Sequence, residues 1–130
     1  MSIARYAATQ NTVGSPRELE IRAFRYVNGL LATAADARGR AVALEKAHRL
    51  WSILLEDLLS PANGLPAALR GQIVSLGLWA QRESQARLGD GGSVEALMAV
   101  HRDMIEGLEA QGRQAVPQRG APAAFAAASA

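Results

Sequence analysis

The chain has 130 residues, with 14 basic and 12 acidic side chains, so its formal net charge is only +2. It has no cysteine, which excludes disulfides, thiolate metal sites and cysteine nucleophiles, and which fits a reducing, cytoplasmic environment. No apolar run approaches the roughly 20 residues that span a bilayer, and segment 1–14 is too mixed and polar for a secretory signal. We therefore expect a cytoplasmic protein that does not enter the membrane. The balanced charge argues against a nucleic-acid partner.

The first predicted helix covers residues 16–36. Ser15 can cap it, Pro16 suits the first helical position, and Glu18 can complete a capping box. Apolar residues then recur at helical spacing. Segment 36–40 contains a glycine and is interpreted as a break.

The second predicted helix covers residues 40–59 and ends at the Pro- and Gly-containing segment 60–66. Its stripe follows the i, i+3, i+4, i+7 pattern that one buried helix face requires. The members of this stripe are Leu44, Ala47, His48, Trp51, Leu54, Leu55 and Leu58.

The third predicted helix covers residues 66–88, and its centre, 73–80, is apolar nearly all round. Such a helix is either central in a bundle or has one face waiting for a partner. A short strand is the alternative interpretation of 73–80, but polar residues 81–85 continue without a turn signal, which favours a helix.

Glycines in segment 89–92 predict a break, after which Ser93 can cap a fourth helix over 94–111. The Ala- and Pro-rich segment 113–130 has too few large apolar residues to order itself, so we expect a disordered tail. The predicted fold class is all-α, a compact bundle of about four helices, with one helical domain at 1–112.

No catalytic, metal or cofactor site emerges from the residue pattern. His48 and His101 both lie in apolar stripes, which is more typical of core histidines than of ligands. Segment 89–93 superficially resembles an anion-binding loop, but no strand precedes it and neither nucleotide-binding fingerprint is present. We therefore expect a protein that is not an enzyme, needs no cofactor and works by binding another protein.

The candidate partner-binding residues are Val74, Gly77, Leu78, Trp79 and Trp51. Trp51 falls in the stripe of the second helix, where a core position is the simpler interpretation. Trp79 leaves the main stripe of the third helix, so both core and interface remain open. Gly77 could let a partner backbone approach closely, or it could allow tight packing inside the bundle.

Several segments resemble the FlaF family of alphaproteobacterial flagellar proteins, over roughly residues 3–111. The Ser-Pro-Arg-Glu start is weak by itself because any capped helix could carry it, and the most specific part runs from Trp51 to Trp79. The matching positions are Tyr6 and segments 15–20, 51–54, 57–58, 63–66, 69–70 and 73–79.

The resemblance implies a cytoplasmic protein required for flagellin synthesis and filament assembly. It implies flagellin as the partner, bound through its terminal helices before export in the manner of a secretion chaperone. The alternative is a post-transcriptional regulator of flagellin that acts through a second regulator, FlbT, or on flagellin mRNA. The resemblance supplies no catalytic residues.

Overall fold

The computed structural model describes residues 15–115, which form helices α2 (Pro16–Thr33), α3 (Ala37–Leu58), α4 (Ala67–Asp90) and α5 (Glu95–Ala115). The predicted all-α fold of four helices is confirmed, and this part of the chain contains no strand. The strand alternative for 73–80 is wrong, because these residues lie within α4. Residues 113–115 of the predicted disordered tail belong to α5, and residues 116–130 lie outside the described residues.

The first helix starts as predicted, but the break after it comes about three residues earlier than predicted. The Ser15 side chain accepts from the Glu18 backbone N–H at 3.1 Å, and the Glu18 carboxylate accepts from the Ser15 N–H at 2.9 Å. These two bonds are the predicted capping box. Helix α2 ends at Thr33 and α3 begins at Ala37, because Asp36 is its N-cap and accepts from the Gly39 N–H at 2.7 Å.

The connection between α4 and α5 also differs from the predicted break at 89–92. Helix α4 continues through Gly89 to Asp90 and ends at Gly91, whose φ of 67° is the left-handed conformation that glycine adopts without steric cost. Ser93 accepts from the Glu95 N–H at 3.1 Å, which satisfies one free donor at the start of α5. Helix α5 then runs to Ala115, past the domain boundary predicted at residue 112.

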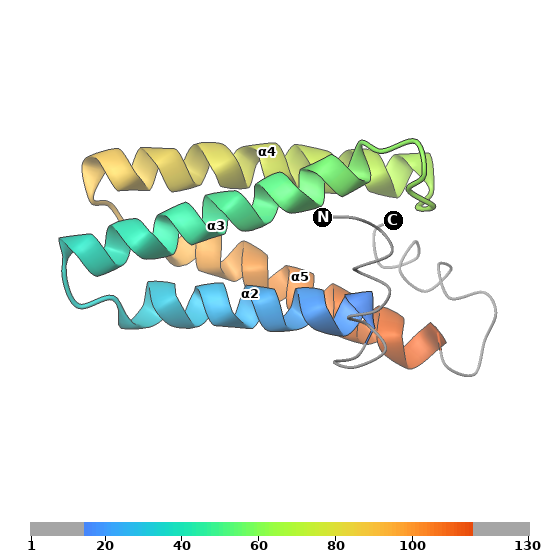
Figure 1. The fold of residues 1–130 in the computed structure, drawn as a ribbon, viewed down its shortest axis with the longest axis horizontal. Helices are drawn as coiled ribbons and strands as arrows, with labels where there is room; N and C mark the ends of the chain where they lie inside the picture. The colour runs from blue at the N-terminus through green and yellow to red at the C-terminus, as the bar shows by residue number, and fades with distance from the viewer. Residues whose placement is uncertain (1–14, 116–130) are drawn as a thin grey trace.

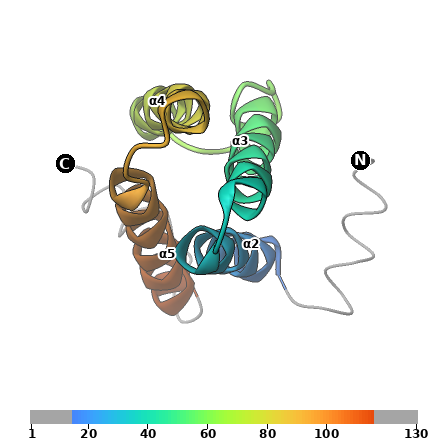
Figure 2. The same ribbon diagram turned by 90° about the vertical axis from the view of Figure 1, so that its left-hand side faces the viewer.

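The bundle consists of two helix pairs. Helix α3 packs mainly on α4 and α2 mainly on α5, while α4 and α5 make few contacts with each other. Viewed from one end, the four helices surround a shared core (Figure 2). From the side, α5 slants away from α4 (Figure 1), so much of the surface of α4 is not covered by another helix.

The core lies between the two pairs and receives side chains from every helix. Helices α2, α3 and α5 each have a one-sided apolar distribution, as amphipathic bundle helices do. The largest fully buried side chains of the core include an indole, a phenyl ring and an imidazole. These fully buried residues are Trp51, Phe24, Leu44, Leu97, His101 and Ser84.

Candidate partner-binding site

Helix α4 differs from the other three because its apolar residues are spread around the whole helix. Four of its residues, Leu69, Gly77, Ala80 and Ser84, are buried against the rest of the bundle. Its other apolar side chains are only partly covered or are exposed. The predicted partner residues on α4 therefore differ in exposure according to their positions around the helix.

Gly77 and Trp51 lie together inside the bundle rather than on its surface. The Trp51 side chain is fully buried, as its place in the stripe predicted. A Cβ built on Gly77 would lie 2.9 Å from Trp51 Cε3 and 2.9 Å from Leu55 Cδ2. The space beside Gly77 is thus occupied by α3, and in this arrangement neither Gly77 nor Trp51 is available to a partner.

This close approach predicts that Gly77→Ala destabilises the protein. An alanine normally gains about 1 kcal/mol over glycine inside a helix, but overpacking a filled site costs typically 1–3 kcal/mol, and the rigid Trp51 ring has no room to move aside. We expect a net loss of up to about 2 kcal/mol in the free energy of unfolding, measured by urea denaturation.

Gly71→Ala is the matched control on the same helix. A Cβ at Gly71 meets nothing within 4 Å, so this variant should gain stability by about 1 kcal/mol. An increase in both variants would show that α3 and α4 can separate at little cost beside Gly77.

The remaining candidates, Val74, Leu78 and Trp79, lie around the uncovered side of α4. Successive helical residues are 100° apart, so Leu78 lies 100° from Gly77 and Trp79 lies 200° from it. Leu78 is 46% exposed, while Val74 and Trp79 are half-buried. Trp79 packs against the edge of the core.

Val74 and Trp79 border one exposed strip of α4, which we call the α4 outer strip. Val74 and Trp79 are 140° apart and flank it, and Gly71, Ser75 and Leu78 form its centre. All three central residues are exposed. The strip therefore has two small residues and one exposed leucine along its middle, and apolar side chains at both margins.

Sequence reasoning did not find a buried polar network that joins three helices. The Trp51 indole N–H donates to His101 Nε2 at 2.9 Å, and His101 Nδ1 lies 2.8 Å from Asn28 Oδ1. Because an indole only donates, His101 Nε2 must accept, so the neutral ring carries its proton on Nδ1 and donates it to Asn28. Asn28 Nδ2 in turn donates to the Met98 carbonyl at 3.0 Å.

The network gives His101 a structural role. Its side chain is fully buried, which confirms the predicted core position. Burial penalises the charged imidazolium and lowers the pKa of His101 from 6.5 to about 4. A ring that stays neutral and has both nitrogens engaged inside the core is poorly placed to exchange protons with a substrate.

A second ionisable group with a displaced pKa lies at the start of α2. Burial, reinforced by the charge of Asp57 and opposed by that of Arg17, raises the pKa of Glu20 from 4.5 to about 7. Glu20 and Arg17 line a surface pocket of about 230 Å³ together with Ser15, Pro16, Leu108 and Gln111. Asp57 is held from the other side by the Asn63 amide, which donates to its carboxylate at 3.2 Å.

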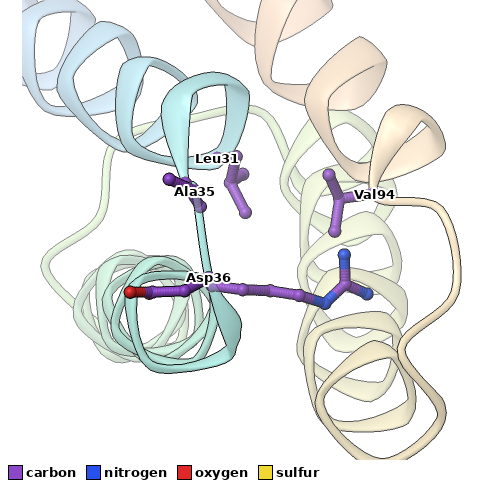
Figure 3. Close-up of a pocket in the computed structure, with 6 residues that line it drawn as sticks. Leu31, Ala35, Asp36 and Val94 are labelled. Atoms are coloured by element: carbon purple, nitrogen blue, oxygen red, sulfur yellow. The ribbon is translucent and has the colours of Figure 1, made fainter.

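The other surface pocket, about 210 Å³, lies where the α2–α3 connection meets the start of α5 (Figure 3). Its walls include Leu31, Asp36 and Val94, and Arg40 completes them. The Arg40 guanidinium is already engaged, since it donates to the carbonyls of Arg87 and Gly92. Arg40 thereby ties the start of α3 to the α4–α5 connection.

The anion-binding interpretation of segment 89–93 has no support in this geometry. The Gly91 N–H donates to the Arg87 carbonyl at 3.0 Å, and the Gly92 N–H donates to Asp90 Oδ1 at 2.7 Å. These backbone donors are used within the turn, so they are not directed at a ligand.

Within residues 15–115, no group of three or more His, Asp or Glu side chains is placed to hold a metal ion. Over the same residues, no helix is long and apolar enough to cross a bilayer.

Comparison with known families agrees with the segments that suggested a flagellar protein. The family model described as flagellar protein FlaF matches residues 2–108, which is most of the chain. The chain belongs to the FlaF family. This FlaF protein is therefore a flagellar protein, and its family is not one of known enzymes. No curated protein and no solved structure matches the chain.

Proposed function

We propose that this FlaF protein is a flagellin-binding secretion chaperone that holds a terminal helix of flagellin on the α4 outer strip before export. Its membership of a flagellar family supports a flagellar partner. The observation that carries the proposal is that α4, unlike α2, α3 and α5, has apolar side chains all round, and that α5 covers little of it. Control of flagellin synthesis would follow from the amount of flagellin that it holds.

The α4 outer strip suits a helical ligand. Packed helices lie 8–10 Å apart, and small residues at the contact permit the closer end of this range. Gly71 and Ser75 supply small residues one turn apart, with open space over Gly71. A partner helix lying over them would place its apolar side chains against Val74, Leu78 and Trp79, in the manner of an amphipathic helix in a groove.

The test is calorimetric titration of purified flagellin into the wild-type protein and its variants. Leu78→Asp places a charge at the centre of the contact and should abolish measurable binding. Trp79→Ala removes an aromatic anchor and should cost about 2 kcal/mol, which is roughly a thirtyfold loss of affinity.

Leu88→Asp is the matched control. Leu88 lies on the same helix and is 52% exposed, close to the 46% of Leu78. It is about 15 Å further along the helix axis and turned to another side. We expect flagellin to bind this variant with wild-type affinity.

Three outcomes would contradict the proposal. Full affinity in folded Leu78→Asp and Trp79→Ala would remove the α4 outer strip as the docking surface. Equal losses in Leu78→Asp and Leu88→Asp would indicate a general effect of the added charge. Absence of binding by the wild type would remove flagellin as the partner, leaving FlbT or flagellin mRNA to be tested.

A further inference from the structure

Helix α3 carries a second exposed stripe that the proposed function does not use. Val42, Lys46, Arg49 and Ile53 follow one another at intervals of four, three and four residues, so they lie on one face of the helix. All four are exposed, including Val42 at 45% and Ile53 at 53%. We call this set the α3 stripe.

The α3 stripe faces away from α4. Trp51 and Leu55 are the α3 side chains that touch α4 at Gly77, and Ile53 lies 200° from each of them around the helix. The α3 stripe is therefore a different surface from the α4 outer strip.

Another exposed apolar side chain, Tyr26 of α2, lies at a similar level of the bundle. Phe24 packs edge-on against Trp51, with ring centroids 5.5 Å apart. Tyr26 is 57% exposed. Arg25 pairs with Glu109 of α5, so Tyr26, one position further round, lies on the outer side of α2, away from α5.

The two cations in the middle of the α3 stripe form no ion pair among the described residues. Arg25, Arg87 and Arg102 form ion pairs with carboxylates. Among the described residues, neither Lys46 nor Arg49 has a carboxylate within ion-pair distance, although Glu45 precedes Arg49 by one turn. Two cations without an ion-pair partner thus lie between two exposed aliphatic side chains.

We propose that the α3 stripe docks an acidic amphipathic helix from a partner protein. The ligand helix would place carboxylates opposite Lys46 and Arg49, and apolar side chains against Val42 and Ile53. From Val42 to Ile53 the stripe rises about 16 Å along the axis, which corresponds to about three helical turns of ligand. Complementary charge sets the register of such a contact, and the apolar ends contribute buried area.

The chemistry of the α3 stripe favours a protein ligand over RNA. Single-stranded RNA is held by aromatic rings that stack on bases and by a groove of many cations along the backbone. The α3 stripe itself has only two cations and no aromatic ring, and its other two members, Val42 and Ile53, are aliphatic. Such side chains are better suited to the apolar face of a helix than to bases or phosphates.

The probe is a fluorescein-labelled synthetic helical peptide, with two glutamates one turn apart between leucines, titrated with the full chain and followed by anisotropy. We expect the wild type to bind it, and Lys46→Glu and Arg49→Glu each to lose at least tenfold in affinity. A second peptide, with lysines in place of the glutamates, should bind these two variants better than the wild type. Circular dichroism checks that each variant is folded.

Arg82→Glu is the control, because Arg82 is an exposed cation on α4. This variant should bind the acidic peptide as the wild type does, and Arg49→Glu should bind flagellin as the wild type does. The flagellin result separates a failure of this proposal from a failure of the α4 outer strip.

Equal loss in Arg82→Glu, or no rescue by the lysine peptide, would show attraction to net charge alone and overturn the proposal. It would also be overturned if a 20-nucleotide RNA bound more tightly than the acidic peptide and lost affinity in the same two variants.

Discussion

Replacing Trp51 with alanine should lower the free energy of unfolding by about 3–5 kcal/mol, the range observed when a fully buried large aromatic is truncated. Trp51 is completely buried, touches the Phe24 ring edge-on and fills the space beside Gly77. Its loss would leave a cavity and would deprive His101 Nε2 of its donor. Because domains of this size are stabilised by only about 5–15 kcal/mol, we expect a large fall in the midpoint of urea denaturation.

Trp79→Ala is the control for Trp51→Ala. Trp79 is only half-buried, at the edge of the core, so less area is returned to water and the cost should be clearly smaller. If the two variants unfolded at the same urea concentration, the core would not be centred on Trp51.

His101 should make the protein less stable in mild acid. In the unfolded chain an imidazole has a pKa near 6.5, whereas burial lowers the pKa of His101 in the folded protein to about 4. Between these values the unfolded state binds more protons, so stability falls as the pH is lowered from about 6.5 to 4. A tenfold difference in proton affinity is worth about 1.4 kcal/mol, so the loss approaches about 3 kcal/mol near pH 4.

Protonation would also disrupt the Trp51–His101 contact. A second ring proton on Nε2 would face the indole N–H, so two donors would oppose each other where one hydrogen bond now exists. We therefore expect His101→Gln to be less stable than the wild type at pH 7, but with a much flatter dependence on pH over this range.

Glu20 has the opposite effect on the pH dependence of stability, so its contribution must be separated from that of His101. Because the pKa of Glu20 is raised to about 7, the folded state binds more protons than the unfolded state between about pH 4.5 and 7. Stability contributed by protonated Glu20 is therefore lost as the pH rises through this range. Measuring urea denaturation from pH 7.5 to 4 in a Glu20→Gln background isolates His101, and a flat profile there would contradict its proposed role.

The sequence predicted best those features that local chemistry decides. The capping box at Ser15 and Glu18 needs only two residues three apart in the chain, and the buried apolar face of α3 needs only helical spacing. Several helix ends were predicted wrongly, and two of them show how a residue that signals a break can belong to a helix or cap it. Asp36 was assigned to a break when it is an N-cap, and α4 tolerates Gly89 before ending at Gly91.

The candidate site was harder to predict because it depends on how α4 is rotated in the bundle. Apolar residues surround this helix, so the spacing of Val74, Leu78 and Trp79 could not say which side faces α3. The structure shows that Gly77 lies on the side of α4 that faces Trp51 and Leu55 of α3. The Trp51–His101–Asn28 network likewise joins residues from three helices, and no spacing rule connects them.

The pairing of α2 with α5 has a consequence for how the protein is made. Helices α3 and α4 are neighbours in the chain and pack on each other, so they can associate through local contacts soon after both have been synthesised. Of the described helices, α2 leaves the ribosome first, yet it packs mainly on α5, the last of them. During translation the apolar face of α2 around Phe24 therefore stays partly exposed to solvent until Leu97, His101 and Leu108 of α5 have been synthesised. A ribosome that stalls before Glu95 would leave a nascent chain with an open core, which is a target for proteases and general chaperones.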